Sequence, residues 1–239
     1  MNVWNRGFTL TWLGHSTFRL VTRTGQVIYF DPWLQSNPMC PEAERAVERC
    51  DLIVLSHAHG DHSADVVRLA TRFECPVVCA HEASIFLASK GVTTCSAQGK
   101  SGTQRIGAFA FTMVHATHSS SFQDGGQIVY AGGEAGFVVT LEDGTKLYHA
   151  GDTGLTADMQ FTGELYAPEI ALLPIGDHYT MGPREAAYAA RLVRSKWIVP
   201  MHYGTFPALT GTPEALRTEL AALGVAATVI APRPGEDVS

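Results

Sequence analysis

The sequence lacks the long apolar run that a membrane helix requires. No uninterrupted stretch reaches roughly 20 apolar residues, and residues 1–14 do not place a charged segment before an apolar core, as a secretory signal does. We therefore expect a cytoplasmic protein with no membrane association. Basic blocks are also missing, and the formal charge of -6 at pH 7 is spread along the chain. This balance argues against nucleic acid as a partner, because phosphate backbones are held by clustered Lys and Arg, but it allows a small phosphorylated substrate.

Cysteine is scarce and shows no paired spacing. The five cysteines form an odd set without CxxC, which argues against a disulfide framework or a zinc ribbon. Cys75 and Cys79 flank the β-type run 76–78, so we expect them to be small buried residues. A Pro/Gly linker and low-complexity stretches are also missing from the 239 residues, which predicts a single domain, 1–239. The sequence leaves the oligomeric state open, a homo-oligomer included.

The first half of the chain alternates in the manner of β-strands. Runs at 8–13, 16–21 and 26–30 predict an antiparallel meander, and residues 51–55 are typical of a strand buried on both faces. Ser63 is expected to cap a helix that runs to about residue 73. The elements predicted next are a strand at 76–80, a helix at 82–90, a strand at 92–95, a loop at 96–103, a strand at 104–114 and then a long polar connection.

The second half of the chain also predicts strands followed by helices. Strands at 137–141 and 146–149 predict a hairpin across the Asp143-Gly144 turn, and Pro183 suits the first turn of a helix. The other elements predicted are strands at 169–173, 197–199 and 226–230 and a helix at 213–223, followed by a loose tail. Strands in two clusters, each followed by helices, favour an α/β (α+β) fold in which two packed sheets are covered by helices, a four-layer αββα sandwich.

The strongest chemical signal is the run His57-Ala58-His59-Gly60-Asp61-His62. It lies between a predicted buried strand and a predicted helix, so the core fixes its backbone. His57 and His59 are two apart in an extended turn, project to the same side and can share one cation. Asp61 and His62 can face a neighbouring cation. Because charged imidazoles at this spacing repel one another, the run indicates a metal site rather than a polar loop.

Further motifs extend along nearly the whole chain. They are Gly14-His15-Ser16, Phe30-Asp31-Pro32, Thr117-His118-Ser119-Ser120-Ser121, Tyr148-His149-Ala150-Gly151-Asp152-Thr153, Leu173-Pro174-Ile175-Gly176-Asp177, Thr180-Met181-Gly182-Pro183 and Pro200-Met201-His202-Tyr203. Together with the H-x-H-x-D-H run, they resemble the metallo-β-lactamase superfamily, in its branch of metal-dependent hydrolases related to ascorbate-6-phosphate lactonase. The resemblance implies the αββα fold of that superfamily, a hydrolase and a two-metal site.

The resemblance also implies a set of metal ligands. The first metal is expected on His57, His59 and His118, the second on Asp61, His62 and His202, with Asp152 bridging both. Asp152 suits this role because small neighbours in its Gly-Asp-Thr-Gly turn let the carboxylate approach a cation closely. His115 is an alternative to His118 on the same segment, and we prefer His118 for its position before the serine run. Zinc is our first choice of metal, with manganese or iron as alternatives, because mixed His/Asp sites accept all three.

Other polar side chains are expected beside the ligands. His15, Asp31 and His149 are candidates to orient them, since metal-bound imidazoles usually donate their other N–H to a carboxylate or carbonyl. Asp31 is the foremost of these, whereas an ordinary structural role is an equal alternative for His15 and His149. We hypothesise that His178 and Tyr203, which adjoin the motifs of the second half, bind substrate or donate a proton to a leaving group.

The implied reaction is hydrolysis by a hydroxide bridged by two divalent metals and oriented by Asp61. Two dications offset by Asp61, Asp152 and the hydroxide leave about one excess positive charge, which favours a small anionic substrate with an ester, lactone or phosphodiester bond. The alternatives are a nuclease or phosphodiesterase acting on RNA or nucleotides, and a non-catalytic metal-bound regulatory or binding protein. A class B β-lactamase is disfavoured because it needs a cysteine ligand, and an oxygen-reducing diiron protein because it carries Glu where His59 stands.

Overall fold

The computed structural model describes residues 3–239, which divide into two compact units. The first unit extends to Gly99 and includes Ser119–Gly133 and Pro232–Ser239, and the second consists of Lys100–His118 and Glu134–Ala231. Each unit is built on one seven-stranded sheet with helices. The predicted mixed α/β fold with two large sheets is therefore confirmed, whereas the single domain 1–239 stays a prediction.

The sheet of the first unit combines an antiparallel meander with a parallel half. Its strands, in spatial order, are β16 (Asp237–Val238), β1 (Thr9–Trp12), β2 (Phe18–Val21), β3 (Val27–Phe30), β4 (Leu52–Val54), β5 (Val77–Ala80) and β6 (Cys95–Gln98). The strands β1, β2 and β3 pair antiparallel as predicted, and β3 to β6 pair parallel. Since β3 and β4 are parallel neighbours, the residues that follow them meet at one sheet edge.

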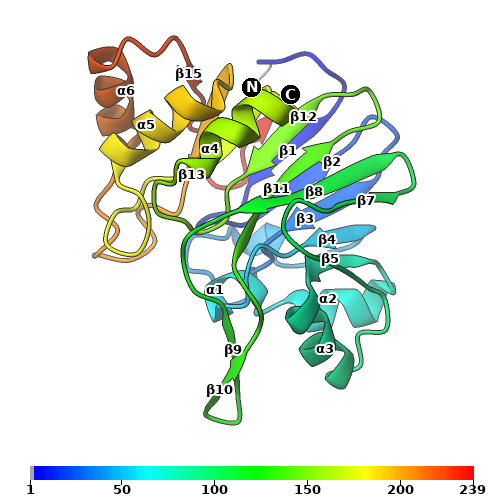
Figure 1. Ribbon diagram of the computed structural model, residues 1–239. Coiled ribbons are helices and arrows are strands. Elements are labelled where there is room, and N and C mark those ends of the chain that lie inside the picture. Colours follow the sequence, from blue (N-terminus) through cyan, green and yellow to red (C-terminus); the bar gives the residue numbers. More distant parts are fainter. Residues whose placement is uncertain (1–2) are drawn as a thin grey trace. The chain divides into compact units, whose positions relative to one another are not determined.

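Short helices and a hairpin complete the first unit. They are a 3-10 turn (Glu42–Glu44), α1 (Gly60–Ser63), α2 (Val66–Phe73), α3 (His81–Ser89), β9 (Ser121–Asp124) and β10 (Gln127–Tyr130). Helices α2 and α3 lie beside β4, β5 and β6 (Figure 1). Val66, Leu69 and Leu87 face the core from these helices and are fully buried. Cys75 and Cys79 are buried as predicted.

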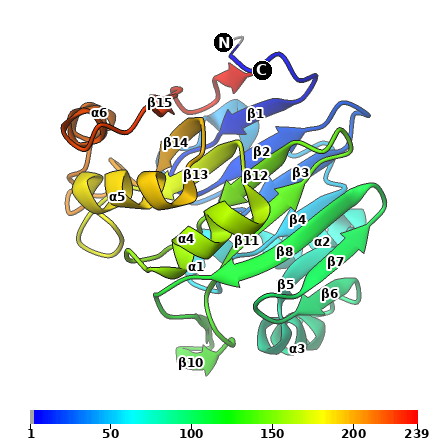
Figure 2. The same ribbon diagram turned by 45° about the horizontal axis from the view of Figure 1, so that its top comes forward.

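The sheet of the second unit combines a parallel half with an antiparallel half. Its strands, in spatial order, are β15 (Thr228–Val229), β14 (Trp197–Met201), β13 (Ile170–Pro174), β12 (Lys146–His149), β11 (Ala135–Thr140), β8 (Phe109–His115) and β7 (Thr103–Ile106). The helices are α4 (Asp158–Phe161), a π-helical turn (Thr162–Tyr166), α5 (Pro183–Val193) and α6 (Pro213–Ala222). Figure 2 shows α4 and α5 lying across the strands of this sheet. Prolines stand in the first turns of α5 and α6, where a missing N–H costs nothing.

The prediction that Ser63 caps a long helix is wrong. The Ser63 hydroxyl donates to the carbonyl oxygens of Ala58 (2.8 Å) and His59 (3.0 Å), so Ser63 ends the one-turn helix α1. Helix α2 begins separately at Val66, after Asp65. The Asp65 carboxylate is occupied by the backbone N–H groups of residues 34 and 35 and by Arg68. Ser63 therefore stabilises the backbone of the run 57–62, which precedes it, instead of starting the next helix.

Four other predicted segments differ from the structure, each because of strand pairing that its own sequence does not show. The expected loop 96–103 contains most of β6, which pairs with β5, and the expected strand 104–114 is the hairpin β7–β8. The polar connection contains the hairpin β9–β10, turned by Gly125 and Gly126 at positive φ, a conformation that glycine adopts at no steric cost. The expected loose tail contains β16, which pairs with β1. Among the described residues, no helix is both long and apolar enough to cross a bilayer.

Candidate metal centre

The histidine run follows β4 and is held by hydrogen bonds on both sides. The N–H of Leu55 donates to the carbonyl of Val78 (2.9 Å), which extends the sheet almost to the run. The N–H of Ala58 donates to the Ser120 hydroxyl (3.2 Å), and the Ser63 hydroxyl donates to the Ala58 carbonyl oxygen. The backbone of the run is therefore fixed before any ion binds.

His57 and His59 present two ring nitrogens to the same point. The Nε2 atom of His57 lies 3.1 Å from Nδ1 of His59, and the rings meet edge to face. Two nitrogens that bind one tetrahedral zinc at 2.0 to 2.1 Å are about 3.3 Å apart. The pair therefore has the spacing that a shared cation requires, and its role as a pair of ligands stays a prediction.

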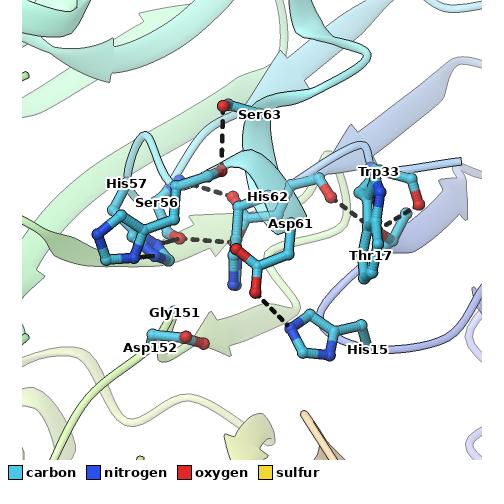
Figure 3. A network of polar contacts seen from close by, with 12 residues as sticks. His15, Thr17, Trp33, Ser56, His57, Asp61, His62, Ser63, Gly151 and Asp152 are labelled. Atoms are coloured by element: carbon cyan, nitrogen blue, oxygen red, sulfur yellow. Dashed lines mark hydrogen bonds and ion pairs between the residues drawn. The ribbon is translucent and has the colours of Figure 1, made fainter. Parts of the chain in front are cut away.

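A buried carboxylate orients two rings of the run. The Asp31 carboxylate, which is fully buried, accepts the Ser56 N–H (2.7 Å), the Ser56 hydroxyl (2.6 Å) and Nδ1 of His62 (2.8 Å). Because the Ser56 hydroxyl donates to Asp31, it accepts from Nδ1 of His57, 3.0 Å away. Figure 3 shows Ser56 with His57 and His62. Both Nδ1 atoms are thus engaged, so Nε2 is the atom that each ring presents to a metal.

His15 orients the carboxylate of the run. Its Nε2 atom lies 3.1 Å from Oδ2 of Asp61, and Figure 3 shows the ring directed at that carboxylate. The His15 ring is fully buried and packs edge to face against Trp33, with ring centroids 5.3 Å apart. Asp61 keeps a third of its side chain exposed (33%), which leaves an oxygen accessible to water. His15 therefore holds the Asp61 carboxylate in place.

A second group of expected ligands lies in the second unit, around Asp152. Oδ2 of Asp152 is 2.9 Å from Nε2 of His202 and 3.7 Å from Nε2 of His118. Asp152 and His202 are almost fully buried. One carboxylate oxygen facing two imidazole nitrogens is the donor arrangement that a bridging ligand provides. His115 is exposed and lies 3.7 Å from Asp158, so the geometry favours His118 over His115.

Three further candidates from the sequence occupy different surroundings in the second unit. His149 is buried, and its Nδ1 atom accepts the Gly151 N–H (3.2 Å), so it supports the turn that carries Asp152. Burial raises the pKa of Tyr203 to about 12, so its phenol keeps its proton at neutral pH. His178 is exposed and packs edge to face against Tyr179.

Two residues that sequence reasoning missed hold candidate ligands or their neighbours in place. The Ser56 hydroxyl donates to Asp31 and accepts from His57, so it links the two side chains. The sequence signals this role only by the position of Ser56 between a buried strand and the first histidine. Thr153 joins the segment of His118 to the Asp152 turn, because its hydroxyl accepts the Thr117 N–H (3.0 Å). Neither serine nor threonine is distinctive enough in a sequence to reveal these roles without the fold.

Gly176 is required by the close approach of the His202 backbone. A Cβ at Gly176 would overlap the His202 carbonyl oxygen, and His202 itself has φ +57. We expect Gly176→Ala to lower the free energy of unfolding by about 3 kcal/mol, since fixed backbone atoms cannot relax from an overpacked contact. Urea unfolding of the metal-free protein measures this change. Gly99→Ala is the control, because a Cβ at Gly99 meets nothing within 4 Å; an equal loss in both variants would contradict the packing argument.

Comparison with known proteins identifies the family. A model described as "Beta-lactamase superfamily domain" matches residues 9–202. A UPF0173 metal-dependent hydrolase of Koribacter versatilis is 50% identical over 211 residues, covering 88% of this chain and 91% of the relative. The chain belongs to the UPF0173 metal-dependent hydrolases of the β-lactamase superfamily. This hydrolase is also 48% identical over 239 residues to a UPF0173 relative of Roseiflexus castenholzii, covering 98% of both chains.

A solved structure shows the same likeness in three dimensions. Igni18, described as a novel metallo hydrolase from the hyperthermophilic archaeon Ignicoccus hospitalis, matches with a TM-score of 0.85 and 36% identity, covering 97% of both chains. The predicted superfamily, its fold and the class of metal-dependent hydrolase are therefore confirmed. The relation to ascorbate-6-phosphate lactonase stays a prediction.

Proposed function

We propose that this hydrolase binds two divalent cations, zinc before manganese or iron, and cleaves an ester, lactone or phosphodiester bond of a small anionic substrate. The observation that carries the proposal is the pair of imidazole nitrogens of His57 and His59, whose 3.1 Å separation suits one shared cation. The full donor set, five imidazoles and two carboxylates, suits borderline divalent ions better than calcium, which prefers oxygen alone.

The ligands that we assign follow the family motif. His57, His59 and His118 would hold one cation, Asp61, His62 and His202 the second, and Asp152 both. Two features of the structure support the assignment. Asp31 accepts directly from Nδ1 of His62 and supports Nδ1 of His57 through the Ser56 hydroxyl, as second partners of metal-bound histidines do. In the second unit, Asp152 faces one histidine assigned to each cation.

When bound, the cations lower the pKa of a water molecule towards neutrality and polarise the scissile carbonyl or phosphoryl bond. The residues of the chain then position that water and the substrate. Asp61 accepts a hydrogen bond from the attacking water through its exposed oxygen, and His15 keeps the carboxylate in place. Tyr203, protonated at neutral pH, can donate to the substrate or the leaving group, and His178 can bind substrate. Near-normal turnover in Tyr203→Phe and His178→Ala proteins would remove these two roles.

Asp31 is a positioning residue whose loss weakens metal binding. We expect Asp31→Asn to lower the affinity for the metals by roughly 10-fold to 100-fold, as is found when the carboxylate behind a metal-bound histidine is removed. Competition with a chromophoric chelator measures this. Asp51→Asn is the matched control, because the Asp51 carboxylate also accepts a backbone N–H, from Val27, but contacts Arg49 rather than a histidine. Equal affinities in the two variants would contradict the role of Asp31.

The choice between His118 and His115 can be tested by counting metals. We expect His118→Ala to lose about one of two metal equivalents, because the first cation keeps only His57, His59 and Asp152. His115→Ala is expected to keep both, since its ring lies beside Asp158. Metal content is measured by mass spectrometry after removal of loosely bound ions. The reverse pattern would make His115 the ligand.

The reaction is tested by assaying metal-quantified protein against lactones, carboxylic and thio esters, phosphodiesters and RNA. Turnover of at least one small anionic compound, lost in Asp152→Asn, is the expected result. Turnover of RNA alone would favour the nuclease alternative. Full metal content without turnover of any compound would favour a binding or regulatory protein.

A further inference from the structure

Two buried cysteines meet in the first unit, at the beginning of two neighbouring strands. Cys50 precedes β4 and Cys75 precedes β5, and these strands pair parallel (Figure 1). The two Sγ atoms lie 3.6 Å apart, although the residues are 25 positions apart in the chain. We propose that Cys50 and Cys75 are a site of reversible oxidation, at which hydrogen peroxide converts the two thiols into a disulfide. The site contains none of the assigned metal ligands, so the inference is independent of the proposed hydrolytic function.

The two sulfur atoms are close enough to bond without a change of fold. A disulfide has an S–S distance of about 2.05 Å, so sulfurs that are 3.6 Å apart must approach by roughly 1.5 Å, which small rotations of the two side chains provide. The Ile53 N–H donates to the Pro76 carbonyl oxygen (2.9 Å), so β4 and β5 are still paired next to Cys75. Strand pairing therefore holds the two cysteine backbones near each other.

The cysteine pair lacks the donors of a metal site. A structural zinc site takes four protein ligands, most often cysteine and histidine. Within the described range, residues 3–239, no histidine, aspartate, glutamate or further cysteine completes a set of three ligand atoms with Cys50 and Cys75. Both cysteines are 3% exposed. The reaction open to the pair is thus bond formation between its own sulfur atoms.

Cys75 is the thiol that reacts first. The hydrogen bond with the Cys50 thiol lowers the pKa of Cys75, against the opposing effect of burial, which favours the reactive thiolate. The thiolate attacks one oxygen of the peroxide and breaks the O–O bond, which leaves a sulfenic acid on Cys75 and a hydroxide that takes up the thiol proton to form water. The Cys50 sulfur then attacks the Cys75 sulfur, and the displaced hydroxide leaves with the Cys50 proton as water. Two thiols thus lose two electrons, and one peroxide becomes two waters.

The disulfide would close a loop that contains the candidate metal-binding run. Residues 51–74 include β4, the run 57–62 and α2. A cross-link restricts the unfolded chain more than the folded chain, in which the two cysteines already meet. Oxidation is therefore expected to raise the melting temperature by roughly 10 °C. The bond would stabilise the segment that carries the run under oxidising conditions.

Oxidation is tested on the full-length protein with hydrogen peroxide, followed by alkylation of the remaining thiols in denaturant. Trypsin releases Cys50 within residues 50–68 and Cys75 within residues 73–90, so the disulfide appears in mass spectrometry as two linked peptides that dithiothreitol separates. Because Cys79 lies in the same peptide as Cys75, fragmentation of the linked pair assigns the bond. We expect a bond between Cys50 and Cys75, a loss of two of the five free thiols, and a rise in melting temperature that dithiothreitol reverses.

Variants separate this pair from the other thiols. Cys75→Ala is expected to abolish both the bond and the rise in melting temperature. Cys40→Ala is the matched control, since Cys40 is equally buried (3%) but its Sγ atom contacts the Pro41 carbonyl oxygen rather than a thiol. Cys79→Ala removes the hydrogen bond between Cys79 and Cys95, and the expected disulfide should still form.

The peptide map of the wild-type protein decides the proposal even if a variant fails to fold. A bond between Cys79 and Cys95 alone, or oxidation of the thiols to sulfinic acids without any link, would overturn it. An unchanged melting temperature in fully cross-linked protein would overturn the stabilising role of the bond.

Discussion

Asp152→Asn is expected to reduce kcat/KM by on the order of 10³-fold or more, because a site that loses a cation would no longer hold the pKa of the attacking water near neutrality. Asn keeps the shape of the side chain but removes the negative charge that offsets the cations. In the metal-free state, the same change also removes the carboxylate that faces His118 and His202. Steady-state kinetics with metal content measured on the same samples test both effects.

The control for this variant is Asp158→Asn, which changes an exposed carboxylate of the same unit beside His115. It should retain activity within about two-fold, as surface substitutions away from a site usually do. A metal content and kcat/KM equal to wild type in Asp152→Asn would show that this carboxylate is no ligand. Normal metal content with lost activity would restrict it to a role in catalysis.

Removing the metals is expected to abolish turnover and to lower the melting temperature by roughly 20 °C. Each ion present at about 1,000 times its dissociation constant stabilises the folded state by about 4 kcal/mol, so two ions contribute about 8 kcal/mol, and each kcal/mol shifts a domain of this size by about 2 to 4 °C. Dialysis against a chelator followed by calorimetry and assay measures both losses. Zinc, manganese and iron are then added back separately to identify the ion that restores them.

The control is the same chelator saturated with calcium, which exposes the protein to the reagent without stripping its metals. Recovery of both stability and activity with one ion is the expected result. Unchanged turnover after chelation, in protein that metal analysis shows to be essentially metal-free, would contradict the proposed function. A fall in stability without any effect on turnover would make the ions structural.

The parts of the fold that could be predicted are those with local signals. The buried strand β4 and the histidine run that follows it are adjacent in sequence, so residues 51–62 alone are enough to predict both. The helix starting at Pro183 was equally visible from its proline and its alanine-rich face. Segments formed by pairing were missed: β6 contains Ser96 and Gln98, whose polarity hides a strand until β5 supplies its partner. The two-residue strand β16 likewise exists only against β1.

The candidate site shows the same division between local and distant information. The residues of the run reveal themselves by type and spacing, whereas the contact of Asp31 with Ser56 depends on β3 and β4 being parallel neighbours. Asp152 and His202 follow β12 and β14, two strands separated by β13, so only the sheet order explains their 2.9 Å contact. Composition and periodicity contain no information about that order.

The most direct measurement is anomalous X-ray scattering from crystals of the metal-loaded protein, collected at the absorption edge of the bound metal. The account predicts two peaks per chain: one at ligand distance from His57, His59 and His118, the other from Asp61, His62 and His202, with Asp152 reaching both. A single peak, or a peak bound by Asp31 with His57 and His62, a trio whose donor atoms also lie close enough to hold an ion, would contradict it.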